Sequence, residues 1–331
     1  MKYFHLIGTV LIFMVLGCRP DSVKEDPVKI IFDTDFGPDY DDAGALAFLH
    51  AMADSGKAEI LATISCNRHE LVGPGLDVMN TYYGRPELPM GAPKGSAVDL
   101  GAWQHWLDTL VAKYPHRIET TSKLPDAVAV YREVLNDQPD TSVTVVTVGF
   151  LTNLANLLKS QPDSISPLSG MELVSRKVKR LVSMAGKFPE GKEFNVHMDS
   201  LASAFVFASW PTPVIFTGFE IGWEIRTGLR LIASDIRGNP VRDVFRICIP
   251  MAEEDRNGRM SWDETAVMIA VYGTSGFFNT VAGSIVVNSD GSNGWTDDPG
   301  GKHRYVVQKM PVDQMSRFIE DRMMHIPVNN P

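Results

Sequence analysis

The chain has 331 residues, of which 44% are hydrophobic, 21% charged and 9% aromatic, and its formal net charge is −9. This composition is typical of a folded globular protein with a large core, and it excludes a disordered chain. Three cysteines are too few for a disulfide-stapled miniprotein, and a negative surface repels nucleic-acid backbones, so a metal ion or a small neutral molecule is the favoured ligand class.

Residues 1–17 have the pattern of an export signal. Lys2 is followed by an apolar stretch, residues 6–16, that is too short to cross a bilayer as a helix but fits the core of a secretory signal. The alternative is a buried helix that starts at Met1. The polar segment that follows at once, residues 18–27, favours a signal followed by a tether.

The sequence Val15-Leu16-Gly17-Cys18 resembles the processing box of bacterial lipoproteins. The resemblance implies that Cys18 becomes the lipidated N-terminus and holds a soluble domain, residues 28–331, at a membrane surface. We therefore expect an exported bacterial lipoprotein, in the periplasm or at the outer-membrane surface, that contacts the membrane only through its lipid anchor.

From residue 28 onward, short strand-like runs alternate with longer helical patterns. The expected strands are residues 28–32, 59–65, 143–148, 178–184, 213–217, 280–287 and 304–308. The expected helices are residues 42–53, 76–83, 126–135, 151–158, 200–208 and 264–272, with a last helix that begins at Pro311. This alternation predicts one α/β domain with an open, mostly parallel sheet and helices on both faces.

Ligands of open parallel sheets bind beyond the carboxyl ends of the strands, which directs attention to the residues after the first expected strand. Five aspartates follow it within ten residues: Asp33, Asp35, Asp39, Asp41 and Asp42. One or two of them can cap a helix, but five such charges in a crevice repel each other unless a cation offsets them. A site made only of oxygen ligands suits Ca²⁺ or Mg²⁺ rather than zinc.

The aspartate segment resembles the signature of the inosine–uridine-preferring nucleoside hydrolases, an Asp-x-Asp-x-Gly run that leads into Asp-Asp-Ala at a helix start. Here the two parts are residues 33–37 and 41–43, with two extra residues between the glycine and the aspartate pair. Further segments resemble family elements in the same order along the chain: Ile64-Ser65-Cys66-Asn67, residues 147–153, Met184-Ala185-Gly186 and Glu193-Phe194-Asn195.

The resemblance implies a Ca²⁺-dependent N-ribosyl hydrolase that releases free base and ribose from ribonucleosides or related ribosides. By position, the implied calcium ligands are Asp35, Asp42, Asp263 and the main-chain carbonyl of Val148. Asp35 is also the implied catalytic base, which helps an activated water to attack C1′ of the ribose.

Four more residues are implied to bind the ribose hydroxyls: Asp41, Asn67, Glu193 and Asn195. Buried polar groups of that kind reject a 2′-deoxy sugar, because the sugar would leave them unpaired. Asp33 is implied to brace the ligands from behind rather than to bind the ion. The alternatives stay open: Asn67 can be a turn residue, and Glu193 and Asn195 can be solvated loop residues.

Two departures from the family pattern concern the base end of the site. Well-studied members carry a His-Asp pair where this chain has Trp262-Asp263. A tryptophan cannot donate a catalytic proton, but its face can stack on a purine, so we predict that Trp262 contacts the base. The alternative is an interior tryptophan that fills space. Residues 186–192 form a short loop without the asparagine that usually binds the 5′-hydroxyl, so the preferred base stays open.

Two other functions compete with hydrolysis. A non-catalytic periplasmic protein could use the same calcium and ribose site only for capture. The missing histidine favours this function, and the intact carboxylates argue against it. A haloacid-dehalogenase-type phosphatase shares the Asp-x-Asp of residues 33–35, but it needs a threonine or valine where this chain has Gly37. The family commonly forms dimers or tetramers, and no sequence feature decides whether this chain is a homo-oligomer.

Overall fold

The computed structural model describes Met1 and residues 26–327, so the predicted export signal, Cys18 and most of the tether lie outside the described residues. The strands are β1 (Val28–Thr34), β2 (Ala58–Ser65), β3 (Met90–Gly91), β4 (Val143–Thr147), β5 (Val178–Met184), β6 (Gly191–Lys192), β7 (Val214–Thr217), β8 (Arg226–Thr227), β9 (Arg259–Met260), β10 (Phe278–Val287), β11 (Ser292–Asp297) and β12 (His303–Gln308). The helices are α1 (Asp41–Asp54), α2 (Val72–Tyr82), α3 (Trp106–Lys113), α4 (Ala127–Asn136), α5 (Thr152–Lys159), α6 (Gly170–Lys177), α7 (Phe194–Met198), α8 (Ser200–Ser209), α9 (Phe219–Glu224), α10 (Leu229–Ala233), α11 (Pro240–Cys248), α12 (Trp262–Tyr272) and α13 (Val312–Met323).

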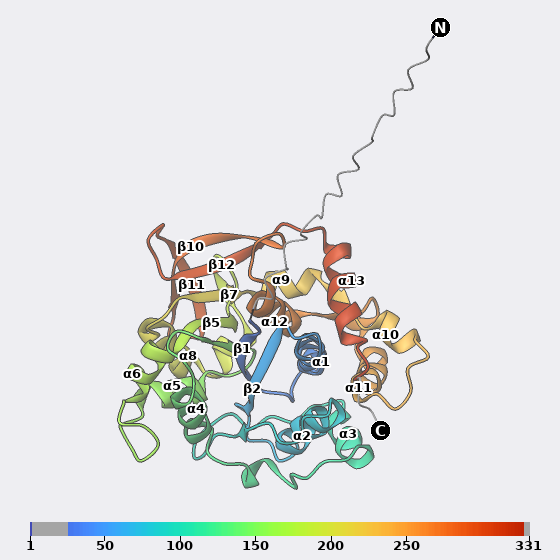
Figure 1. The fold of residues 1–331 in the computed structure, drawn as a ribbon, viewed down its shortest axis with the longest axis horizontal. Coiled ribbons are helices and arrows are strands. Elements are labelled where there is room, and N and C mark those ends of the chain that lie inside the picture. The colour runs from blue at the N-terminus through green and yellow to red at the C-terminus, as the bar shows by residue number, and fades with distance from the viewer. Residues whose placement is uncertain (2–25, 328–331) are drawn as a thin grey trace.

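The main sheet has the strand order β3-β2-β1-β4-β5-β7-β12-β10-β11-β6 (Figure 1). Neighbours from β3 to β12 are parallel, and β10, β11 and β6 extend the sheet with antiparallel pairs. Helices α4, α5, α6 and α8 cover one face, while α1, α12 and α13 lie on the other. The expected open, mostly parallel sheet with helices on both faces is confirmed. None of the described helices is both long and apolar enough to cross a membrane.

The central strands are buried on both faces, which explains their near-continuous apolar sequences. Residues 30–34 of β1 and all of β4 are buried. Helix α1 is buried over residues 41–52 and packs against β2, α12 and α13. Gly44 makes the approach of α12 possible, because a Cβ there would lie 2.2 Å from Oε1 of Glu264. The close contact brings the N-terminal ends of α1 and α12 together at one edge of the sheet.

The expected strands and helices are present, with small shifts at their ends. Hydrophobic periodicity does not predict several elements, among them α3, α6, α11 and β11. Two of them carry readable cap signals: Ser169 and Glu172 form a capping box at α6, and Asn239 caps α11 just before Pro240. Strand β11 lacks apolar alternation and depends on its pairing with β10.

Candidate active site

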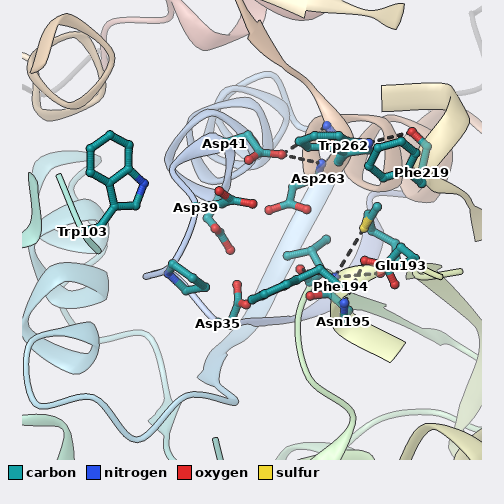
Figure 2. A pocket seen from close by; sticks show the side chains of 14 residues that line it. Asp35, Asp39, Asp41, Trp103, Glu193, Phe194, Asn195, Phe219, Trp262 and Asp263 are labelled. Carbon is teal, nitrogen blue, oxygen red and sulfur yellow. Dashed lines mark hydrogen bonds between the residues drawn. The ribbon is translucent and has the colours of Figure 1, made fainter. Parts of the chain in front are cut away.

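A cavity of about 360 Å³ opens at the carboxyl edge of the parallel strands (Figure 2). Its acidic lining residues are Asp35, Asp39, Asp41, Asp42, Glu193 and Asp263. Its aromatic lining residues are Trp103, Phe194, Phe219 and Trp262, and Pro38, Val148, Met184 and Asn195 complete the wall. Most of the carboxylates lie deep, whereas Trp103 and Phe194 are 58% and 42% exposed at the mouth. The cavity therefore combines an acidic floor with an aromatic rim.

Three buried aspartates converge on the floor from different elements. Asp35 follows β1, Asp42 lies in the first turn of α1, and Asp263 lies in the first turn of α12. Burial is the main cause that raises their pKa values, and the negative charges of neighbouring aspartates raise them further. For Asp42 the pKa rises to about 7. The three carboxylates therefore repel one another, and a cation between them would relieve this repulsion.

One oxygen of Asp42 is fixed by the protein and the other is not. Its Oδ1 accepts hydrogen bonds from the hydroxyl of Thr34 and from the backbone N–H of Phe36 at 3.2 Å. Its Oδ2 is buried and has no hydrogen-bond partner among the described residues. Phe36 has a φ of 34°, and its ring packs edge-on against Trp106 at 5.2 Å. The backbone of Phe36 is therefore strained in this loop. In the same conformation Oδ2 of Asp42 has no hydrogen-bond partner among the described residues.

The turn after β4 brings a main-chain carbonyl to the same floor. The Val148 carbonyl accepts one hydrogen bond, from Nδ2 of Asn195 at 3.2 Å, and a carbonyl oxygen can accept two. The next residue, Gly149, packs directly on the aspartate loop: a Cβ there would lie 2.6 Å from the backbone nitrogen of Asp35 and 2.6 Å from Sγ of Cys66. Glycine at this position is what lets the Val148 turn come close to Asp35.

The residues on the floor fit a hard divalent cation. Within residues 26–327, no group of three or more His, Cys, Asp or Glu side chains is arranged to hold a metal ion as it stands. The fit comes from the unpaired Oδ2 of Asp42, from the repulsion between buried carboxylates and from the Val148 carbonyl, for which one hydrogen bond is described. All of these donors are oxygens, which suits Ca²⁺ or Mg²⁺.

Arg259 balances the other two aspartates of the loop. Its NH2 group lies 2.8 Å from Oδ1 of Asp39 and 3.0 Å from Oδ1 of Asp41. Oδ2 of Asp41 accepts hydrogen bonds from the backbone N–H groups of Trp262 (3.1 Å) and Asp263 (3.3 Å). Asp41 therefore caps α12, and its carboxylate accepts hydrogen bonds from Arg259, Trp262 and Asp263. Its predicted contact with the ribose stays a prediction.

Glu193 and Asn195 lie together on the cavity wall. The Glu193 carboxylate caps α7: it accepts hydrogen bonds from the N–H groups of Asn195 at 2.8 Å, Gly186 at 3.0 Å and Val196 at 3.1 Å. Burial nevertheless raises the pKa of Glu193 to about 7. The Asn195 amide donates to the carbonyls of Val148 and Met184. Both residues line the cavity where a ribose could bind, and their predicted roles remain compatible with this position.

Two predicted site residues do not line the cavity. Asp33 accepts hydrogen bonds from the hydroxyl of Tyr131 at 2.9 Å and from Nδ2 of Asn153 at 3.1 Å, which are contacts of a buried bracing group. Burial raises the pKa of Asp33 to about 7. Asn67 is fully buried behind the wall, and its amide is bonded to backbone groups. The geometry does not support the predicted contact between Asn67 and the ribose.

Trp262 lies in an aromatic group at one side of the cavity. Its Nε1–H donates to the Phe219 carbonyl at 2.7 Å, and the two rings are 5.3 Å apart. The guanidinium of Arg259 lies 5.1 Å from the centre of the Trp262 ring. Trp262 therefore has a fixed orientation and presents part of its face to the cavity, while its only polar hydrogen is already donated.

The sequence reasoning did not identify Arg259, Trp103, Phe194 or Phe219 as site residues. A signal existed for Arg259, because the two-residue expansion of the aspartate loop adds Asp39, a charge that needs a partner. Trp103 is 58% exposed and lines the cavity, which distinguishes it from a packed interior tryptophan. Phe219 follows β7 directly, at the sheet edge where ligands of parallel sheets bind.

The chain is similar to known proteins in sequence and in fold. The family model described as inosine-uridine preferring nucleoside hydrolase matches residues 30–316. A curated relative from Klebsiella pneumoniae, the pyrimidine-specific ribonucleoside hydrolase RihA, is 27% identical over 239 residues, which cover 66% of this chain and 68% of that protein.

Two solved structures show the same fold. The purine-preferring ribonucleoside hydrolase from Gardnerella vaginalis aligns with a TM-score of 0.70 and 18% identity, over 89% of this chain and 98% of that one. A plant nucleoside hydrolase, PpNRh1, aligns with a TM-score of 0.68 and 19% identity, over 90% of this chain and 99% of that one.

Gly149→Ala should displace the Val148 turn from Asp35, because the new Cβ would meet backbone that cannot swing away. We expect a loss of about 1–3 kcal/mol in the free energy of unfolding, typical of overpacking, and a smaller stabilisation by calcium. Thermal unfolding with and without calcium measures both effects. Gly294→Ala is the control, because a Cβ there meets nothing within 4 Å. An unchanged calcium effect in Gly149→Ala would contradict a role for the Val148 turn.

The raised pKa of Glu193 predicts a pH dependence of stability. The folded protein holds this proton more tightly than the unfolded chain, so the stabilisation is complete below about pH 4.5 and is lost as the pH rises to about 7. The difference in unfolding free energy between the protein and Glu193→Gln should change only within this window, by at most about 1.4 kcal/mol per pH unit. Urea unfolding from pH 4 to 8 in a chelator measures it. A difference that stays constant with pH would refute the shift.

Proposed function

The chain belongs to the inosine-uridine preferring nucleoside hydrolase family, and on this premise we propose that it hydrolyses the N-glycosidic bond of ribonucleosides in a calcium-dependent reaction. The products are the free base and ribose. The observation that supports the calcium dependence is the arrangement of Asp35, Asp42, Asp263 and the Val148 carbonyl around one cavity floor, with an unpaired buried oxygen on Asp42.

Asp35 is our candidate for the catalytic base. When bound, calcium would supply positive charge that keeps the floor carboxylates ionised, orients the ribose hydroxyls and acidifies the attacking water. The ionised Asp35 would accept a proton from the attacking water while the oxygen of that water forms a bond to C1′. The C1′–N bond breaks and its electron pair leaves with the base, which takes up a proton from solvent, while Asp35 releases its proton to solvent and is ionised again. Asp263 and Asp42 stabilise the positive charge that develops on the ribose.

Binding of the sugar would fall to the wall of Glu193 and Asn195. Both side chains are anchored by backbone groups, so they offer fixed rather than mobile polar atoms. A fixed polar group binds a substrate poorly when the substrate leaves it without a hydrogen-bond partner. A 2′-deoxyribonucleoside lacks one hydroxyl and would leave such a group unpaired. We therefore propose ribonucleosides, and not their 2′-deoxy analogues, as the substrates.

The departing base would stack on the aromatic rim rather than receive a proton from Trp262. The Nε1–H of Trp262 is donated to the Phe219 carbonyl, which removes the only polar hydrogen of the ring from the reaction. Stacking on Trp262 would stabilise a planar, delocalised base as it leaves, and this stabilisation needs no proton from Trp262. The rim aromatics Trp103 and Phe194 offer further planar surface.

We also propose that the enzyme is exported and anchored by a lipid on Cys18. This part of the proposal rests on the sequence of residues 1–27 alone: one lysine, an apolar stretch, the Val15-Leu16-Gly17-Cys18 box and a polar tether. Metabolic labelling with a radioactive fatty acid tests it, because Cys18→Ser should abolish labelling. Labelling that survives in Cys18→Ser would refute the anchor.

Asp35→Asn should lower kcat by at least about 10²-fold, because it removes the proposed base and one floor charge. Ribose release from a panel of ribonucleosides, with calcium and then with a chelator, measures the loss and names the base. Asp137→Asn, an exposed aspartate at the end of α4, is the matched control. Near-normal turnover by Asp35→Asn would overturn the mechanism. Calcium-dependent nucleoside binding without any ribose release would instead indicate the capture protein.

Trp262→Leu should lower kcat/KM for purine ribonucleosides about tenfold, which corresponds to a lost stacking energy of roughly 1.5 kcal/mol. Inhibition by free D-ribose should change little, because the proposed ribose site, the acidic floor with Glu193 and Asn195, does not include Trp262. Trp223→Leu is a control in the same aromatic group, since Trp223 does not line the cavity. If ribose inhibition and nucleoside turnover fall together in Trp262→Leu, the residue is not part of the base site.

A further inference from the structure

The side-chain amide of Asn67 uses its whole hydrogen-bonding capacity on backbone groups. Its Nδ2 donates to the carbonyls of Leu100 at 2.7 Å and Asp35 at 3.1 Å. Its Oδ1 accepts from the N–H groups of Leu100 at 3.0 Å and His69 at 3.1 Å. An amide has two donor hydrogens and two acceptor positions, so none is left for a ligand.

These bonds join three loops that are far apart in the sequence. Residues 35–40 follow β1, residues 66–71 follow β2, and residues 98–105 precede α3. Two glycines show how tightly the loops meet. A Cβ on Gly37 would lie 2.8 Å from Nδ2 of Asn67, and a Cβ on Gly101 would lie 2.7 Å from Nε2 of His69. A side chain at either glycine would collide with the loop that follows β2, so the three loops are tightly packed where they meet.

The loop that Asn67 holds carries Trp103. The neighbours Ala102 and Gln104 are only 8% and 5% exposed, whereas Trp103 between them is 58% exposed. Figure 2 shows Trp103 on the side of the cavity opposite Phe219 and Trp262. The loop backbone is thus fixed, and one large aromatic side chain projects from it toward the cavity mouth.

We propose that Asn67 is a positioning residue that sets Trp103 relative to Asp35. Its Nδ2 donates to the carbonyl of Asp35, the residue proposed as catalytic base, and to the carbonyl of Leu100, while its Oδ1 accepts from the N–H of Leu100, three residues before Trp103. This side chain joins the acidic floor to this part of the aromatic rim, and the backbone bond from the Arg68 N–H to the Val98 carbonyl holds the two loops together beside it. This role rests on the proposed nucleoside site, and it replaces a direct contact between Asn67 and the ribose.

The role predicts that Asn67 and Trp103 act on the base as a unit. Nucleoside and D-ribose affinities are measured by calorimetry with calcium, in the Asp35→Asn background so that no turnover is needed. Asn67→Ala and Trp103→Ala should each weaken nucleoside binding roughly tenfold, the effect of a lost interaction of about 1.4 kcal/mol. The double variant should lose about the same factor and not the product, because coupled residues are non-additive. Affinity for D-ribose should change far less.

A second measurement tests the clamp itself without any ligand. In Asn67→Ala the backbone amides of Leu100 and His69 lose their acceptor, so their hydrogen exchange should become faster. Asn67→Asp is the matched variant, because its carboxylate still accepts from both amides while the bonds to the Leu100 and Asp35 carbonyls are lost. Asn136→Ala, at an exposed position in α4, is the control for unrelated change.

The outcomes separate this inference from the proposed function. Additive losses of nucleoside affinity, or an equal loss for D-ribose in Asn67→Ala, would overturn the positioning role and restore the ribose contact. Unchanged exchange of the Leu100 amide would also overturn it. A protein that binds nucleosides with the expected coupling but releases no ribose would refute the hydrolase and leave the role of Asn67 standing.

Discussion

The structure is governed by the repulsion between carboxylates gathered at one edge of a parallel sheet. The aspartates after β1 are sorted by the partner that each one finds. Asp33 is held by neutral hydrogen bonds, and Asp39 and Asp41 are paired with the buried Arg259. Asp35 and Asp42 are left, and α12 brings Asp263 to join them. The negative charge that the protein does not neutralise is thereby concentrated where a cation and a sugar would bind.

The fold makes this sorting possible because α1 and α12 begin at the same place. Gly44 allows the two helices to approach closely, and the Asp41 carboxylate caps α12 from the first turn of α1. One side chain therefore joins the start of one helix to the start of the other. The position of Asp263 depends on this junction rather than on its own loop, so the floor is built from elements that pack as a unit.

Local sequence was sufficient for most of the sheet and for the cluster of aspartates after β1, but long-range pairing was not visible. Apolar runs marked β1 and β4, and adjacent aspartates marked the floor. Asp263 was placed only by resemblance to a family, since it lies far from the other carboxylates in sequence. The hydrogen bonds of Asn67 to the loop backbone could not be predicted, because a residue after a strand has the same appearance whether it faces a ligand or ties loops together, and its partner Leu100 lies 33 positions away. Arg259 was not predicted because its partners, Asp39 and Asp41, are also far away in the sequence.

The attachment of the Trp103 loop has an evolutionary consequence. Asn67 grips the N–H and C=O groups of Leu100, which every residue possesses, and it makes no bond to a side chain of the loop. The residue at position 103 can therefore change without disturbing the joint that holds it. A lineage of such enzymes could replace this aromatic group and explore new leaving groups while the acidic floor stays as it is. On the proposed function, the part of base recognition that Trp103 supplies is therefore separable from cleavage of the bond.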